Sequence, residues 1–62
     1  MDTYTKAQII EIIFRQQGEE EILINRLSQK VANSITDEQF QEMVKKSDIP
    51  LKDLGHNRYY IA

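Results

Sequence analysis

The sequence predicts a mainly helical domain in which three short helices are followed by a small C-terminal β-hairpin. Three observations support this prediction. Two segments carry the pattern of a capped helix start, apolar residues recur at helical spacing over residues 6–47, and the last dozen residues are rich in turn and strand formers. A mini-bundle of three or four helices is the alternative, because residues 50–54 fit either a strand or one helical turn.

The two helix starts share one arrangement. Thr5 and Thr36 can each accept a hydrogen bond from the amide three residues further on, and Gln8 and Gln39 can reach back to the capping residue. Apolar side chains flank each cap in the positions of a hydrophobic staple, with Tyr4 facing Ile9 and Ile35 facing Phe40. Each cap stabilises its helix by about 1 kcal/mol.

Three helices are expected, over about residues 6–17, 20–33 and 37–47. The first has isoleucines on more than one side, which predicts a central place in the core, and Gly18 is suited to end it. In the second, Leu23, Leu27 and Val31 recur at a spacing of four with Ile24 beside them, which predicts one core-facing stripe. Three glutamates at its start favour the positive end of the helix dipole.

Residues 51–61 are expected to form the hairpin, with Leu51–Leu54 paired against Arg58–Ile61. Gly55, His56 and Asn57 supply a three-residue turn. Strand side chains alternate between the two faces, so one of the adjacent tyrosines 59 and 60 points into the core and the other points outward. The sequence leaves open which one does so.

The order of three helices and a hairpin resembles the winged helix-turn-helix family, and residues 54–61 resemble the wing of that family, where a glycine-containing tip leads into an aromatic strand. The resemblance implies that the second and third helices form the helix-turn-helix, with the third in the major groove and the wing tip on the backbone or minor groove. Asp37, Glu38 and Glu42 depart from this pattern, because phosphate repels acids near the start of a recognition helix.

Composition excludes several kinds of site. The chain has 62 residues, a net charge of −2, one histidine and no cysteine, so disulfides and thiolate metal sites are absent. We expect no cofactor and no enzyme activity, because no constellation of catalytic side chains is present. The chain has no apolar run of membrane-spanning length and no signal-like start, which predicts a cytoplasmic protein. So small a core also favours association, for example as a homodimer.

Two binding functions remain. The first is a DNA-binding transcriptional regulator that contacts duplex DNA through the wing and the end of the third helix. Its candidate contacts are Lys45, Lys46, Lys52, His56, Asn57 and Arg58. The second is a protein–protein interaction module or inhibitor on the same scaffold, with Glu38, Glu42, Tyr59 and Tyr60 as candidate contacts. The resemblance favours DNA, whereas the net negative charge and the acidic start of the third helix favour a protein. The alternative for the basic residues and His56 is ordinary solvated charge.

Overall fold

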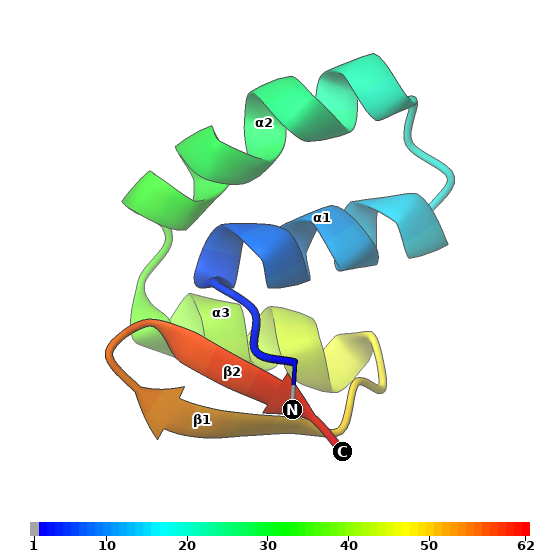
Figure 1. Cartoon of the computed structure of the whole chain (residues 1–62). Helices are drawn as coiled ribbons and strands as arrows, with labels where there is room; N and C mark the ends of the chain where they lie inside the picture. Colours follow the sequence, from blue (N-terminus) through cyan, green and yellow to red (C-terminus); the bar gives the residue numbers. More distant parts are fainter. Residues whose placement is uncertain (1) are drawn as a thin grey trace.

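The computed structural model describes residues 2–62, which form three helices followed by one antiparallel hairpin (Figure 1). The elements are α1 (Lys6–Gln16), α2 (Glu21–Ser34), α3 (Asp37–Lys46), β1 (Leu51–Gly55) and β2 (Arg58–Ile61). The predicted fold class is confirmed, and the helical-turn alternative for residues 50–54 is wrong, because the chain from Leu51 onward pairs with β2.

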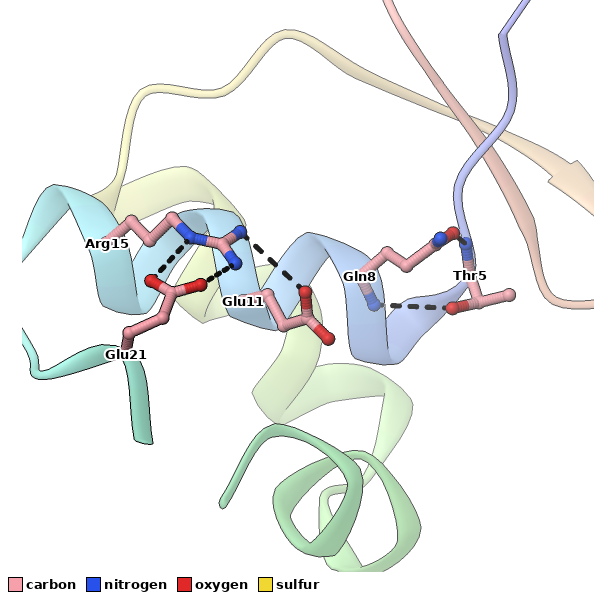
Figure 2. A network of polar contacts seen from close by, with 5 residues as sticks. All are labelled: Thr5, Gln8, Glu11, Arg15 and Glu21. Atoms are coloured by element: carbon pink, nitrogen blue, oxygen red, sulfur yellow. Dashed lines mark hydrogen bonds and ion pairs between the residues drawn. The ribbon is translucent and has the colours of Figure 1, made fainter. Parts of the chain in front are cut away.

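Both predicted helix starts are complete capping boxes. The Gln8 amide donates to Thr5 Oγ1 at 3.2 Å, and the Thr5 amide donates to Gln8 Oε1 at 2.8 Å (Figure 2). Thr36 and Gln39 repeat the pair of bonds at 3.1 and 3.0 Å. Each box satisfies two backbone groups that a helix start otherwise leaves free, which fixes where α1 and α3 begin.

Arg15 ties the end of α1 to the start of α2. Its guanidinium donates through Nε and Nη2 to the two oxygens of Glu21, at 3.2 and 2.6 Å, and a third nitrogen lies 3.7 Å from Glu11 (Figure 2). The hydrogen bonds from Arg15 hold the pKa of the Glu21 carboxyl below its usual value. Both side chains are largely exposed, so this bidentate pair orients the α1–α2 connection rather than adding much stability.

The core is centred on α1, as its pattern of isoleucines predicted. Ile9, Ile10 and Ile13 are fully buried and form one cluster with buried side chains from α3 and β2, namely Phe40, Val44 and Tyr59. Figure 1 shows α1 between α2 on one side and α3 with the hairpin on the other. The central helix is therefore covered on two sides, whereas α2 packs along α1.

The predicted core-facing stripe of α2 is wrong in part. Ile24 and Ser28 are the buried residues of α2, whereas Leu23 and Leu27 each remain 40% exposed. Because α2 is covered mainly by one neighbouring helix, it buries only a narrow strip, and the small Ser28 side chain lies in that strip. The two leucines lie to one side of it and stay at the surface.

The hairpin turn is shorter than the sequence predicted. His56 and Asn57 alone form the loop, with φ angles of 53° and 56°, and Gly55 pairs directly with Arg58. Positive φ at both loop residues is typical of a type I′ turn, which matches the twist of the flanking strands. The three-residue turn is wrong because a bulge between Asp53 and Gly55 takes up the extra residue.

The two tyrosines of β2 divide as strand alternation requires. Tyr59 is 6% exposed, and its ring lies 5.2 Å from that of Phe40 between centroids. Tyr60 lies opposite Lys52 on the outer face and is half-buried. The inward residue is therefore Tyr59.

The segment before α1 adds a backbone bridge to the hairpin that the sequence did not predict. The Tyr4 amide donates to the Tyr59 carbonyl, and the Tyr59 amide donates to the Tyr4 carbonyl, both at 2.8 Å. Tyr4 thus lies against β2 on the side opposite β1 and joins the N-terminal segment to the C-terminal strand.

The end of α3 gives a test of backbone strain. Asp48 has a φ of 55°, and the amides of Asp48 and Ile49 donate back to the carbonyls of Lys45 and Val44. Glycine adopts this conformation without a penalty, so Asp48→Gly should raise the free energy of unfolding by about 0.5–1 kcal/mol, while Asp48→Ala should lower it. Urea unfolding of the three proteins measures this, and a glycine variant no more stable than the alanine variant would contradict it.

Candidate binding site

The turn of the hairpin is held against the start of α1. The Lys6 amide donates to Oδ1 of Asn57 at 2.9 Å, so a residue from the end of the chain satisfies a free backbone donor of the first helix. On the other side of the turn, the Gly55 amide donates to Oδ1 of Asp53 at 2.8 Å. Asn57 therefore fixes the turn relative to α1, and Asp53 fixes the backbone of the hairpin beside the turn.

Lys6 connects the starts of α1 and α3. Its Nζ lies 3.2 Å from Oδ1 of Asp37 and 5.5 Å from the centroid of the Phe40 ring. The Lys6 side chain is largely covered, while the Asp37 side chain is 93% exposed. The ammonium group is therefore already neutralised by a carboxylate and an aromatic face, and one Asp37 oxygen remains open to solvent.

Four segments converge around an open groove of about 490 Å³, which we call the tip groove. They are the start of α1, the end of α2, the start of α3 and the hairpin turn, which Figure 1 shows beside the α2–α3 connection. Its lining residues are Thr5, Lys6, Ala7, Gln29, Ala32, Asn33, Asp37, Gln41, Asp53, Gly55, His56, Asn57 and Tyr59.

The tip groove is polar and carries more negative than positive charge. Two carboxylates, Asp37 and Asp53, line it with one ammonium group, that of Lys6. The amide side chains of Gln29, Asn33 and Gln41 add both hydrogen-bond donors and acceptors. The two carboxylates and one ammonium group favour a cationic group over a phosphate in the groove.

The structure does not bring the predicted nucleic-acid contacts together in one place. His56, Asn57 and Arg58 are at the hairpin turn, beside Asp37 at the start of α3. Lys45 and Lys46 are at the other end of α3, about 12 Å further along by the helical rise. Lys52, Arg58 and Tyr60 share the outer face of the hairpin, since Lys52 pairs with Tyr60 and strand residues two apart lie on one face.

The predicted protein contacts also divide. Glu38 and Glu42 are exposed on α3, and Tyr60 is partly accessible on the outer face of the hairpin. Tyr59 is committed to the core through its ring and to Tyr4 through its backbone. Of the two tyrosines, Tyr60 alone presents its ring on the outer face.

The sequence did not predict most residues of the tip groove as parts of a binding site. Asp53 stands two residues before Gly55, a spacing at which an aspartate can bond the glycine amide, so this local bond was open to prediction. The Lys6–Asp37 and Lys6–Asn57 contacts join residues 31 and 51 positions apart. Nothing local marks such pairs, because they depend on how the helices pack.

Two kinds of site are absent from residues 2–62. No group of three or more histidine, cysteine or acidic side chains in that range is placed to hold a metal ion. None of the described helices has the length and apolar character required to cross a membrane.

Comparison with known proteins finds no match to this chain among protein-family models, curated proteins or solved structures.

The hydrogen bond from Lys6 to Asn57 can be tested with glycine substitutions, because glycine adopts the positive φ angles of the turn. Both loop residues have positive φ, and within residues 2–62 only Asn57 of the two makes a side-chain hydrogen bond. Asn57→Gly should lower the free energy of unfolding by about 1 kcal/mol relative to His56→Gly, because only the first substitution frees the Lys6 amide. Faster hydrogen exchange of that amide in Asn57→Gly alone is the second readout. Equal stability and equal exchange in the two variants would rule out the contact.

The protein should lose folding stability at alkaline pH because of the buried phenol of Tyr59. Burial, and after it the charge of Asp53, raises the pKa of the Tyr59 phenol above its ordinary value of 10. A raised folded pKa gives stability that is fully present below the unfolded pKa and is lost as pH rises through the folded pKa. Tyr59→Phe should therefore lose less stability than the wild type between about pH 9 and pH 12. Urea unfolding across this range measures it, and parallel curves would contradict it.

Proposed function

We propose that this chain is a small protein-interaction module that binds a basic side chain of a partner protein in the tip groove. The observation that supports this most directly is the composition of the groove, in which two carboxylates face one ammonium group that is already paired. A lysine or arginine from a partner would complete the charge balance and find hydrogen-bond acceptors on both aspartates.

The free oxygens of the two aspartates are suited to this role. Asp53 uses Oδ1 to hold the Gly55 amide, and Asp37 uses Oδ1 to hold Lys6, so Oδ2 of each makes no hydrogen bond within residues 2–62. Both side chains are therefore fixed by one oxygen and open through the other. Carboxylates held in this way lose little conformational entropy when they bind.

The polar lining favours a protein segment over a small apolar ligand. Pockets for small molecules are mostly apolar, whereas here amide, carboxylate, imidazole and ammonium groups converge from the four surrounding segments. Side-chain amides such as Gln29, Asn33 and Gln41 can pair with the backbone of an extended partner on either side of its basic residue.

Duplex DNA is the second candidate, on a different surface. Lys45, Lys46, Lys52 and Arg58 are exposed, and no ion pair within residues 2–62 involves them. Such cations are free to neutralise phosphates, and the resemblance to a winged helix makes the hairpin and the end of α3 the expected contacts. The acidic tip groove beside the hairpin turn makes this the weaker of the two proposals.

The protein proposal is tested with a short arginine peptide as the probe and its citrulline counterpart as the uncharged control. Amide chemical shifts of tip-groove residues should move with the arginine peptide only. Asp37→Asn with Asp53→Asn should weaken this binding about tenfold or more, because asparagine retains the hydrogen bonds of Oδ1 but removes the charge. Glu19→Gln with Asp48→Asn removes the same charge from exposed sites outside the groove and should leave binding unchanged.

Unchanged arginine binding in the Asp37→Asn/Asp53→Asn variant would contradict the protein proposal. Titration with a short DNA duplex at low salt separates the second candidate. Four phosphate contacts predict that the logarithm of the binding constant falls against that of the salt concentration with a slope of roughly −3.6. Replacement of Lys45, Lys46, Lys52 and Arg58 by glutamine should then abolish DNA binding. If the wild type binds no DNA at low salt, DNA binding is excluded as the function.

A further inference from the structure

A stripe of exposed residues runs along α2 on a face that the rest of the chain leaves open. Glu20, Leu23, Leu27 and Lys30 follow one another at spacings of three, four and three, which places them on one side of the helix. All four are exposed, including both leucines at 40%. We call this stripe the α2 seam.

Nothing within residues 2–62 accounts for the two leucines of the α2 seam. The side of α2 that packs on α1 is marked by the buried Ile24 and Ser28, one residue further along from each leucine. A leucine on an exposed helix face keeps apolar surface in contact with water, which is unfavourable in free energy compared with a polar residue. A repeat at spacings of three and four is the pattern by which helices pack on other helices.

The charged side chains at the two ends of the seam also make no ion pair within residues 2–62. Glu20 precedes the first residue of α2, but its side chain makes no capping hydrogen bond, and no ion pair within residues 2–62 involves Glu20 or Lys30. The seam therefore carries an unpaired acid at one end, two leucines in the middle and an unpaired cation at the other end.

This order is complementary to itself when a second copy runs antiparallel. A register that sets Leu23 against Leu27 of the second copy also sets Glu20 against Lys30 of the second copy, and the two-fold axis repeats both contacts. A parallel arrangement would instead place Glu20 against Glu20 and Lys30 against Lys30, which is unfavourable. One register thus satisfies the apolar and the charged positions together.

We propose that the α2 seam is the interface of an antiparallel homodimer of this chain. The interface is small, because α2 has 14 residues and only one of its faces takes part, so association depends on concentration. The inference does not depend on the tip groove. Gln29 and Asn33 reach that groove from another side of α2, so each copy of the dimer keeps its groove open.

Sedimentation equilibrium over a range of concentrations tests the proposal. The wild type should show a monomer–dimer equilibrium, and Leu27→Glu should raise the dimer dissociation constant about tenfold or more, because it places an unpaired carboxylate against Leu23 of the second copy. Leu54→Glu is the matched control, since Leu54 is 44% exposed but lies in β1. Helical circular dichroism verifies that each variant is folded. A wild type that stays monomeric, or an equal effect of Leu54→Glu, overturns the proposal.

A charge-exchange experiment tests the antiparallel register. Glu20→Lys and Lys30→Glu should each weaken self-association, because each variant places like charges opposite one another at both ends of the seam. The double variant Glu20→Lys/Lys30→Glu regains opposite charges at both ends of the antiparallel dimer and should return the dissociation constant to near the wild-type value. Single variants that associate as tightly as the wild type, the result expected of the parallel arrangement, or a double variant no tighter than either single variant, overturn the proposed register.

Discussion

The arrangement of the whole chain depends on Tyr59. Its ring packs against Phe40 of α3, while its amide and carbonyl bond to Tyr4, the residue before the cap of α1. One residue thus fixes the hairpin, the third helix and the N-terminal segment relative to each other. The tip groove follows from this constraint, because it opens where those parts meet the end of α2.

Local chemistry explains which parts of the fold the sequence predicted. Thr5 and Thr36 mark helix starts through bonds that span three residues, and Gly18 marks the end of α1 through its positive φ of 81°. Such features depend on residues close together in the sequence and could be predicted from them. Strand alternation likewise limited the inward tyrosine of β2 to two choices.

The errors arose where packing decides between equivalent patterns. Leu23 and Ile24 are adjacent and both apolar, so periodicity alone could not show that Ile24 faces α1 while Leu23 remains at the surface. The bulge beside Leu54 depends on pairing with β2, which no single segment encodes. The site was less predictable still, since Lys6, Asp37 and Asn57 come from three distant parts of the chain and meet only after folding.

The bridge between Tyr4 and Tyr59 also has a mechanical consequence. Because the pairing is antiparallel, the chain that precedes Tyr4 and the chain that follows Tyr59 leave the bridge in the same direction. Tension applied between the ends acts along the direction of the two interstrand hydrogen bonds, which then break in sequence rather than together. The N-terminal segment should therefore peel from β2 at low force, well before the helices separate.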